Sequence, residues 1–302
     1  MLVISWLIHC LLILLSVAFF TLFERKVMGL FHLRLGPNKV SIIGILQPLL
    51  DAFKLLTKQD VYPLRSNKLA YFVSPLLSLF LALFVWLTLP MSYRAISLNF
   101  SFVMFFFVGS VIVFCVLLSG WSSNSKYSLI GSLRSVAQSV SYESVFRTLI
   151  VIVALFYSTY SIQSFSSPSS FLSLTIIPLW VVCTLAETHR APFDFSEAES
   201  ELVSGFNTEY SGAFFALIFL SEYAVLLYSC ILITYLFFGY FIPHSTYLCP
   251  LFLTILGIGF SFIFIWVRIT FCRFRYDLLI ILAWKILLPV SLFFYVFLCF
   301  LF

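Results

Sequence analysis

The chain has 302 residues, of which 62% are hydrophobic and only 10% are charged. A soluble globular domain carries about 25% charged residues, so this composition excludes a soluble domain and also intrinsic disorder. The apolar runs are continuous rather than alternating, which excludes an outer-membrane barrel and leaves a helical protein that crosses the membrane several times. The formal net charge of +5 is small and its basic residues form no exposed stripe, so we expect no nucleic acid partner.

A bilayer core needs about 20 apolar residues per helix, and the sequence offers eight such segments. In chain order, the predicted spans are Leu2–Phe23, Ala70–Pro90, Phe102–Trp121, Val136–Ser158, Phe171–Ala186, Gly212–Tyr240, Pro250–Thr270 and Leu278–Phe302. After the first span, a segment beginning at Pro48 places Leu49, Phe53 and Leu56 on one face, which predicts an amphipathic helix in the membrane interface. The predicted fold is therefore all-α and polytopic, with residues 1–302 forming one integral membrane domain.

The basic residues fall almost entirely in alternate loops of this eight-span plan. Loops 24–68, 122–135, 187–211 and 268–277 hold fourteen of the 17 Lys and Arg residues, whereas the three opposite loops together hold only Arg94. Loops on the cytoplasmic or matrix side of a membrane carry such an excess. We predict that the four basic loops face that side and that both termini lie on the other.

The first basic loop carries two groups of charges with two possible roles each. Glu24, Arg25 and Lys26 follow the predicted first span directly, where they could serve as an interfacial anchor or line a polar site. Asp51 stands among basic neighbours and within reach of Lys54 on the amphipathic helix. It could therefore belong to a polar cavity wall or to a surface ion pair.

Ionisable residues also enter two of the predicted spans. Glu143 and Arg147 are four residues apart in the fourth span, so they share a helix face and can pair. Glu222 lies well inside the sixth span, beside Tyr223. Ionisable residues inside a membrane are costly and indicate function by default, although a structural ion pair is the alternative for Glu143. If the helices meet, Glu143 and Glu222 could serve as stepping stones for protons.

The third basic loop is rich in acids instead of bases. The acids are Glu187, Asp194, Glu197, Glu199, Glu201 and Glu209. Like charges at helical spacing, such as Glu197 and Glu201, raise at least one carboxyl pKa, and such carboxyls can exchange protons near neutral pH. A solvated acidic loop or a cation site is the alternative, although interleaved aromatic residues such as Phe193 argue against full solvation. His189 lies in the same loop, and an imidazole ordinarily titrates near neutral pH.

The last basic loop places Arg268, Arg273 and Arg275 before Asp277. If this segment is helical, Arg273 and Asp277 can pair across four residues. The cluster could fix the membrane orientation or bind an acidic surface of a partner.

The sequence contains no cofactor-binding pattern. No two of the seven Cys residues are closer than 19 positions, which argues against zinc, haem-attachment and iron–sulfur ligand sets. We expect no disulfides, no metal site and no redox cofactor bound by the chain alone.

At these four loops the sequence resembles the family of subunit 1 of NADH:ubiquinone oxidoreductase, the respiratory complex I. The matching stretches are TLFERKVMG, RLGPNKV with QPLLDAFKL, WSSNSKYSLIGSLRSVAQSVSYE, AETHRAPFDFSEAESELVSGFNTEY, and RFRYD with the later WK and LP. They follow the family order between residues 21 and 289, and the family's eight-span plan agrees with the predicted spans.

The resemblance implies roles for three sets of residues. The quinone cavity and its entrance would be lined by Thr21, Glu24, Arg25, Arg34, Asp51, Lys54 and Phe219. Proton coupling would use Tyr142, Glu143, Glu187, Asp194, Glu197, Glu199, Glu201 and Glu222. Contacts with partner subunits would use Arg190, Arg268, Arg273, Arg275 and Asp277.

The resemblance also implies a setting for the chain. Ubiquinone would be its substrate, while FMN and the iron–sulfur clusters would lie on partner subunits. Those partners would be quinone-site subunits of the peripheral arm and antiporter-like membrane subunits, within the lipids of the mitochondrial inner membrane. The termini would then lie on the intermembrane-space side, and the absence of an import presequence agrees with synthesis inside the mitochondrion.

Four positions depart from the family pattern. His189 stands where the family usually has Asn, Ala198 and Ser41 where it has Gly, and Cys272 where it has Pro. Two other functions remain open: the membrane subunit of a related membrane-bound hydrogenase, and a stand-alone ion transporter. Missing internal repeats disfavour a transporter, and the quinone-subunit motifs disfavour a hydrogenase. A plain membrane anchor would not need Glu143 and Glu222.

Overall fold

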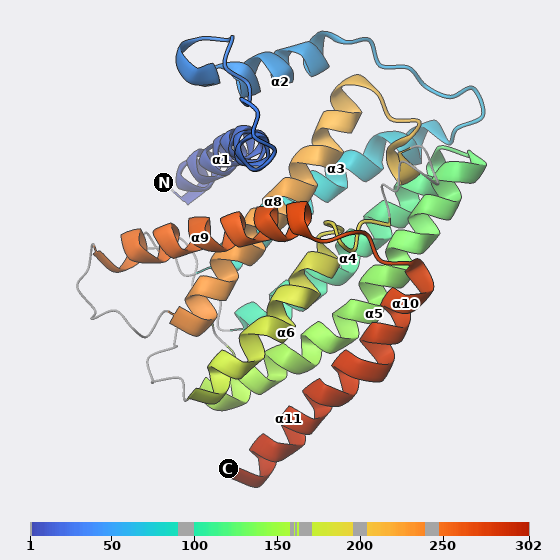
Figure 1. Cartoon of the computed structure of the whole chain (residues 1–302). Helices are drawn as coiled ribbons and strands as arrows, with labels where there is room; N and C mark the ends of the chain where they lie inside the picture. Colours follow the sequence, from blue (N-terminus) through green and yellow to red (C-terminus); the bar gives the residue numbers. More distant parts are fainter. Residues whose placement is uncertain are drawn as a thin grey trace.

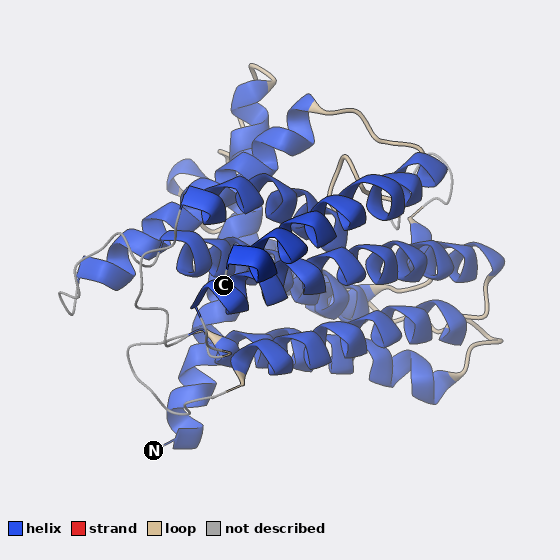
Figure 2. Cartoon of the chain, turned by 90° about the horizontal axis from the view of Figure 1, so that it is seen from below, coloured by secondary structure: helices blue, strands red, loops and turns tan. Residues whose placement is uncertain are grey.

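A computed structural model of the chain describes residues 2–89, 100–157, 160, 162, 171–195, 204–238 and 248–301. Within these ranges every regular element is a helix and no residue lies in a strand, as Figure 2 shows. The all-α prediction is therefore confirmed for the described part of the chain.

Seven helices of the described residues are long and apolar enough to cross a membrane. They are α1 (Leu2–Phe31), α3 (Lys68–Val85) with the 3₁₀ turn η2 (Trp86–Thr88), α4 (Ser101–Ser122), α5 (Lys126–Tyr157), α8 (Gly212–Phe238), α9 (Leu248–Thr270) and the continuous helix α10 (Tyr276–Ile281), η6 (Leu282–Leu287) and α11 (Leu288–Leu301). The remaining predicted span, the fifth in chain order, is the shorter apolar helix α6 (Phe171–Glu187). At about 1.5 Å per residue, α6 falls just short of the hydrocarbon thickness. Together these helices confirm the polytopic prediction.

Two helices extend beyond their predicted ends because charged and hydroxyl side chains do not stop a helix. α1 continues past the predicted end at Phe23 to Phe31, so Glu24, Arg25 and Lys26 lie on the helix instead of in a loop. α5 begins at Lys126, ten residues before its predicted start at Val136. The serines of its first turns donate to carbonyl oxygens three residues earlier, which satisfies their hydroxyl groups within the helix.

The amphipathic helix is present as α2 (Gln47–Thr57) and packs against α1 and α8. Leu49, Phe53 and Leu56 of its apolar face remain 45–65% exposed on this chain. A helix that leaves its apolar face free of protein contacts is typical of one lying in the membrane interface.

Five helices form the centre of the bundle. α3 packs against α4 and α8, α4 packs against α5, and α6 lies between α5 and α8. The C-terminal helix packs on α5, while α1 and α9 pack on α8, with α9 running across it in Figure 1. The core contains fully buried aromatic side chains, among them Tyr142, Trp180 and Tyr228.

The described parts of the four basic loops lie together at one end of this bundle. Hydrogen bonds join Arg65 to Asn124, Asn67 to Ser122, Val61 to Ser211 and Pro192 to Phe274. Alternate loops must meet at one end if each intervening helix crosses the membrane once. The contacts therefore support the eight-crossing plan.

Candidate functional site

Glu24 lies at the centre of a buried ionic cluster. Glu24 is only 3% exposed, whereas a charged residue that anchors a helix at the membrane interface would be exposed. Its Oε1 accepts hydrogen bonds from Arg190 Nη1 at 3.1 Å and from Arg268 Nη1, and Tyr223 Oη donates to Oε2 at 2.7 Å. These residues come from α1, the loop after α6, α8 and α9, so the cluster joins four parts of the chain.

The cluster carries more positive than negative charge. Two guanidinium groups face one carboxylate, and the Arg190 guanidinium also lies over the Tyr223 ring at 4.2 Å from its centre. Burial acts to lower the pKa of Arg190, but the Glu24 carboxylate outweighs this effect and raises it, so Arg190 stays cationic. The arrangement can therefore stabilise a further negative charge nearby.

Phe219 extends the aromatic wall of the cluster, with its ring centre 4.5 Å from that of Tyr223. Phe20 contacts Tyr223 from α1 at a centre-to-centre distance of 5.8 Å. The predicted quinone residue Phe219 thus contacts Tyr223, the tyrosine that donates to Glu24.

A second ion pair connects α1 to the amphipathic helix. Arg25 Nη2 lies 2.6 Å from Asp51 Oδ2, and the Gln47 amide donates to Asp51 Oδ1 at 2.9 Å. Asp51 pairs with Arg25 of α1 although Lys54 is also within its reach along α2. Both members are about 40% exposed, so this is a surface ion pair.

A small apolar cavity of about 220 Å³ lies between α1 and α2. Its lining consists of Leu11, Leu14, Leu15, Ala18, Phe19, Pro48 and Leu49. The Thr21 hydroxyl donates to the Ala18 carbonyl of its own helix, and Arg34 is exposed in the turn after α1. Of the predicted quinone residues, Arg25 and Asp51 therefore pair with each other, and Arg34 is exposed.

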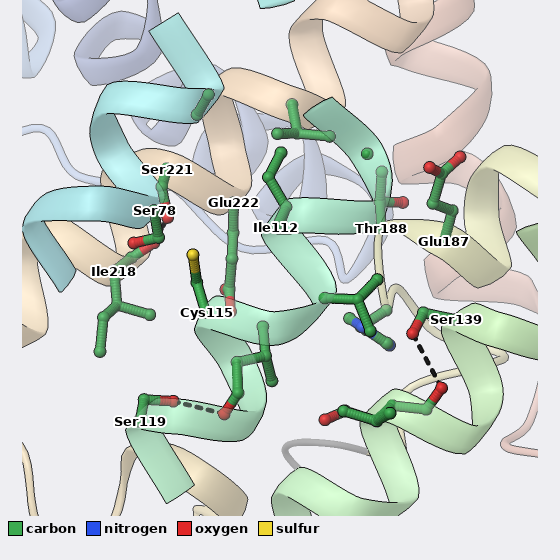
Figure 3. A pocket seen from close by; sticks show the side chains of 18 of the residues that line it. Ser78, Ile112, Cys115, Ser119, Ser139, Glu187, Thr188, Ile218, Ser221 and Glu222 are labelled. Atoms are coloured by element: carbon green, nitrogen blue, oxygen red, sulfur yellow. Dashed lines mark hydrogen bonds between the residues drawn. The ribbon is translucent and has the colours of Figure 1, made fainter. Parts of the chain in front are cut away.

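Three of the predicted proton-coupling carboxylates share one cavity. Glu143 of α5, Glu187 at the end of α6 and Glu222 of α8 line a space of about 90 Å³ between the helices. Serines contribute most of the other polar lining: Ser74, Ser78, Ser119, Ser135, Ser139 and Ser221. Figure 3 shows Glu187 and Glu222 reaching this space from different helices. Most of the surface of this cavity is apolar, but its carboxyl and hydroxyl groups can hydrogen-bond water, and the space has room for several molecules at roughly 10–15 Å³ each.

The other predicted coupling residues have different surroundings. Glu143 also pairs with Arg147, as their spacing predicted. Tyr142 is fully buried, and its hydroxyl donates to the Leu279 carbonyl, so it faces the C-terminal helix. Asp194 pairs with Arg273 at 3.5 Å. Glu197, Glu199 and Glu201, together with Ala198, lie outside the described residues, so their proposed proximity stays a prediction.

The last basic loop does not form the predicted helical ion pair. Residues 271–275 are not helical and α10 begins only at Tyr276, so Arg273 and Asp277 lack the helix on which their pairing depended. Arg275 contacts Asp277 at 3.1 Å instead. Arg190 and Arg268 face the internal Glu24 cluster, and their role at a subunit interface stays a prediction.

His189 lines the carboxylate cavity, and burial lowers its pKa from an ordinary value of 6.5 to about 4. The imidazole is therefore neutral at neutral pH, and the titration near pH 7 that the sequence allowed is not expected. The residue has a positive φ of 50°, a conformation that Asn adopts readily.

We expect His189→Asn to leave the pH dependence of activity unchanged between pH 6.5 and 8.5. Below pH 6.5 the imidazole of His189 binds a proton in the unfolded chain but stays neutral in the folded chain. His189 therefore lowers the free energy of unfolding as the pH falls toward 4. The variant should gain on the order of 1 kcal/mol at pH 5. Thermal unfolding at pH 5 and pH 7.5 checks this: a gain at both values would indicate a packing effect instead.

Sequence reasoning missed two features of the site. The serines of the cavity carry no motif, although Ser128, Ser132, Ser135 and Ser139 recur at helical spacing and mark one face of α5. The partners of Glu24 lie 166 and 244 residues away, a distance that no local pattern can bridge. Within the described ranges, no group of three His, Cys, Asp or Glu side chains could hold a metal ion.

These features define a polytopic helical membrane protein with ionisable side chains buried among its helices. Residues 4–299 match the family model described as NADH dehydrogenase, and the chain belongs to that family. It is 45% identical to NADH-ubiquinone oxidoreductase chain 1 of Aedes aegypti, over 93% of this chain and 89% of the relative. The protein of the same name from Anopheles gambiae is 46% identical over the same shares, and that from Monodelphis domestica is 43% identical over 97% and 94%. The resemblance drawn from the loop motifs is confirmed.

Proposed function

We propose that this chain is the membrane subunit of respiratory complex I that walls much of the ubiquinone access cavity and couples quinone reduction by NADH to proton translocation. It would act in the mitochondrial inner membrane, beside quinone-site subunits of the peripheral arm and antiporter-like membrane subunits. The names of its relatives support the NADH and ubiquinone parts of this proposal.

One observation carries the coupling part. Neighbouring residues of α8 serve two different sites: Tyr223 donates to Glu24 in the ionic cluster, and Glu222 lines the carboxylate cavity. Arg190 of the cluster also interacts electrostatically with Glu222. A change of charge at the cluster would therefore be felt directly by the carboxylates of the cavity.

The cluster and the apolar cavity suit the two parts of a quinone. An apolar tail fits the space between α1 and α2, next to the interfacial helix that borders the membrane. Reduction of the headgroup places negative charge on its oxygens until protons arrive. The surplus positive charge of Arg190 and Arg268 would stabilise that charge, and the carboxylates would respond by changing their proton affinity.

The first test uses the native membrane. After gentle solubilisation and separation of intact complexes, we expect this chain to migrate with NADH:quinone reductase activity that a quinone-site inhibitor blocks. Migration with hydrogenase activity would favour the related hydrogenase subunit, and migration alone would favour a stand-alone transporter. Either result would refute the proposal and leave the membrane topology standing.

A further inference from the structure

The Tyr210 hydroxyl lies at the centre of a buried hydrogen-bonded cluster, outside the residues assigned to the proposed function. It follows the 3₁₀ turn η4 (Gly205–Asn207) on the basic-loop side, is 5% exposed, and stacks on Tyr71 with ring centres 4.2 Å apart. Tyr210 Oη lies 3.1 Å from Ser74 Oγ and 3.2 Å from Ser122 Oγ, and donates to the Ser119 carbonyl at 3.3 Å. A single phenol hydroxyl thus connects α3 to the end of α4.

This cluster adjoins the carboxylate cavity. Ser74 and Ser119 contact Tyr210 and also line the cavity, and Figure 3 places Ser119 at its border. Ser122 contacts the same phenol but does not line the cavity, and it lies two residues before the exposed Asn124 of the basic-side loop. The order from the loop side to the cavity is therefore Ser122, Tyr210 and Ser74.

The cavity itself has the chemistry to hold water. Ser119 and Ser139 donate to carbonyl oxygens of their own helices, as drawn in Figure 3, which leaves lone pairs on each hydroxyl oxygen free to accept. His189 lines the same cavity, and its Nδ1 is withdrawn from solvent and has no hydrogen-bond partner among the described residues. A buried polar atom without a protein partner is typically satisfied by internal water.

We propose that protons reach the carboxylate cavity from the basic-loop side through the hydroxyl group of Tyr210. This route rests on the proposed function, since it supplies the carboxylates that the coupling uses. The Tyr210 hydroxyl turns from the Ser119 carbonyl to donate to Ser74. A proton delivered at Ser122 then binds Tyr210 Oη as the phenol O–H bond breaks and its proton passes to Ser74. Ser74 in turn releases its own proton to cavity water and on to a carboxylate. Each oxygen gains one proton and loses one, so no charge remains on the route.

Burial raises the pKa of Tyr210 above its ordinary value, so the hydroxyl stays protonated and can both donate and accept. The competing explanation is that these hydroxyls only hold helices together, as serines often do in membranes. The two explanations predict different effects when the hydroxyl alone is removed.

Tyr210→Phe keeps the stacked ring and removes only the hydroxyl. Measured in the assembled enzyme in sealed membrane vesicles, proton translocation with quinone reduction should fall by roughly tenfold or more. The solvent deuterium isotope effect on turnover should rise, because proton delivery becomes limiting. NADH oxidation by a soluble acceptor and the amount of assembled enzyme should not change.

Tyr71→Phe is the matched control. Its hydroxyl belongs to the same stack but donates to the Glu209 carbonyl at 2.7 Å and does not line the cavity. We expect normal coupling in this variant. Equal losses in both variants, or a loss of assembly with Tyr210→Phe, would show a structural role and overturn the route. Normal translocation with Tyr210→Phe would also overturn it, whereas the carboxylate variants described below test the proposed function separately.

Discussion

Glu24→Gln should strongly reduce the amount of assembled protein. The substitution removes the carboxylate that contacts both Arg190 and Arg268, whose side chains are 14% and 34% exposed. Removing one partner from a buried ion pair costs about 3–5 kcal/mol, because the remaining charge stays buried without compensation. A loss of this size is a large share of the total stability of a domain. Native gel separation of mutant and wild-type membranes measures the assembled fraction.

The second variant of this experiment tests the mechanism. Glu24→Gln combined with Arg268→Gln restores the original net charge of the cluster, so the double variant should assemble better than Glu24→Gln alone. Asp51→Asn is the exposed control, since the Asp51–Arg25 pair is about 40% exposed and should contribute at most about 1 kcal/mol. A double variant that assembles no better than the single one would contradict the charge-balance explanation.

The sequence predictions succeeded where the residues involved are close together in the sequence and failed where they meet only in the folded chain. The spans were predictable because each needs only a continuous apolar stretch of sufficient length. The Glu143–Arg147 pair was predictable because both residues lie on one helix, where a spacing of four fixes their relative position. Both predictions depend only on residues that are close in the sequence.

The Glu24 cluster depends on tertiary packing and was therefore not predictable. Glu24 follows an apolar segment and looks like an interfacial charge, but α1 continues past it and α8 and α9 cover it. Its partners Arg190 and Arg268 reside in different loops of the sequence plan. Composition cannot distinguish a charge at the membrane surface from one buried against another helix.

The Arg273 prediction failed for a local reason. Pairing with Asp277 required a helix through both residues, but α10 starts at Tyr276. The extended segment before it aims Arg273 at Asp194 of another loop instead. Helix ends are the least certain part of any sequence prediction. A predicted ion pair with one residue on each side of a helix end therefore depends on where that helix begins.

Glu143→Gln should lower the rate of proton-coupled quinone reduction while leaving the enzyme assembled. The amide keeps the size of the carboxyl group but cannot take up and release a proton, and Glu143 shares its cavity with Glu187 and Glu222. Loss of a group that transfers protons typically lowers the rate by about 10²-fold or more. Glutamine can still accept a hydrogen bond from Arg147, so the helix contact should survive.

Three measurements on sealed vesicles test this prediction. Quinone reduction by NADH and proton translocation should both fall, whereas NADH oxidation by a soluble acceptor should stay normal because that reaction avoids the membrane subunit. Glu209→Gln is the matched control, since Glu209 is an acid of the same basic-side region that does not line the cavity. Normal proton translocation in Glu143→Gln would refute a coupling role for this carboxylate. Equal losses in both variants would mean that proton translocation depends on the negative charge of the whole region and not on the cavity shared by the three carboxylates.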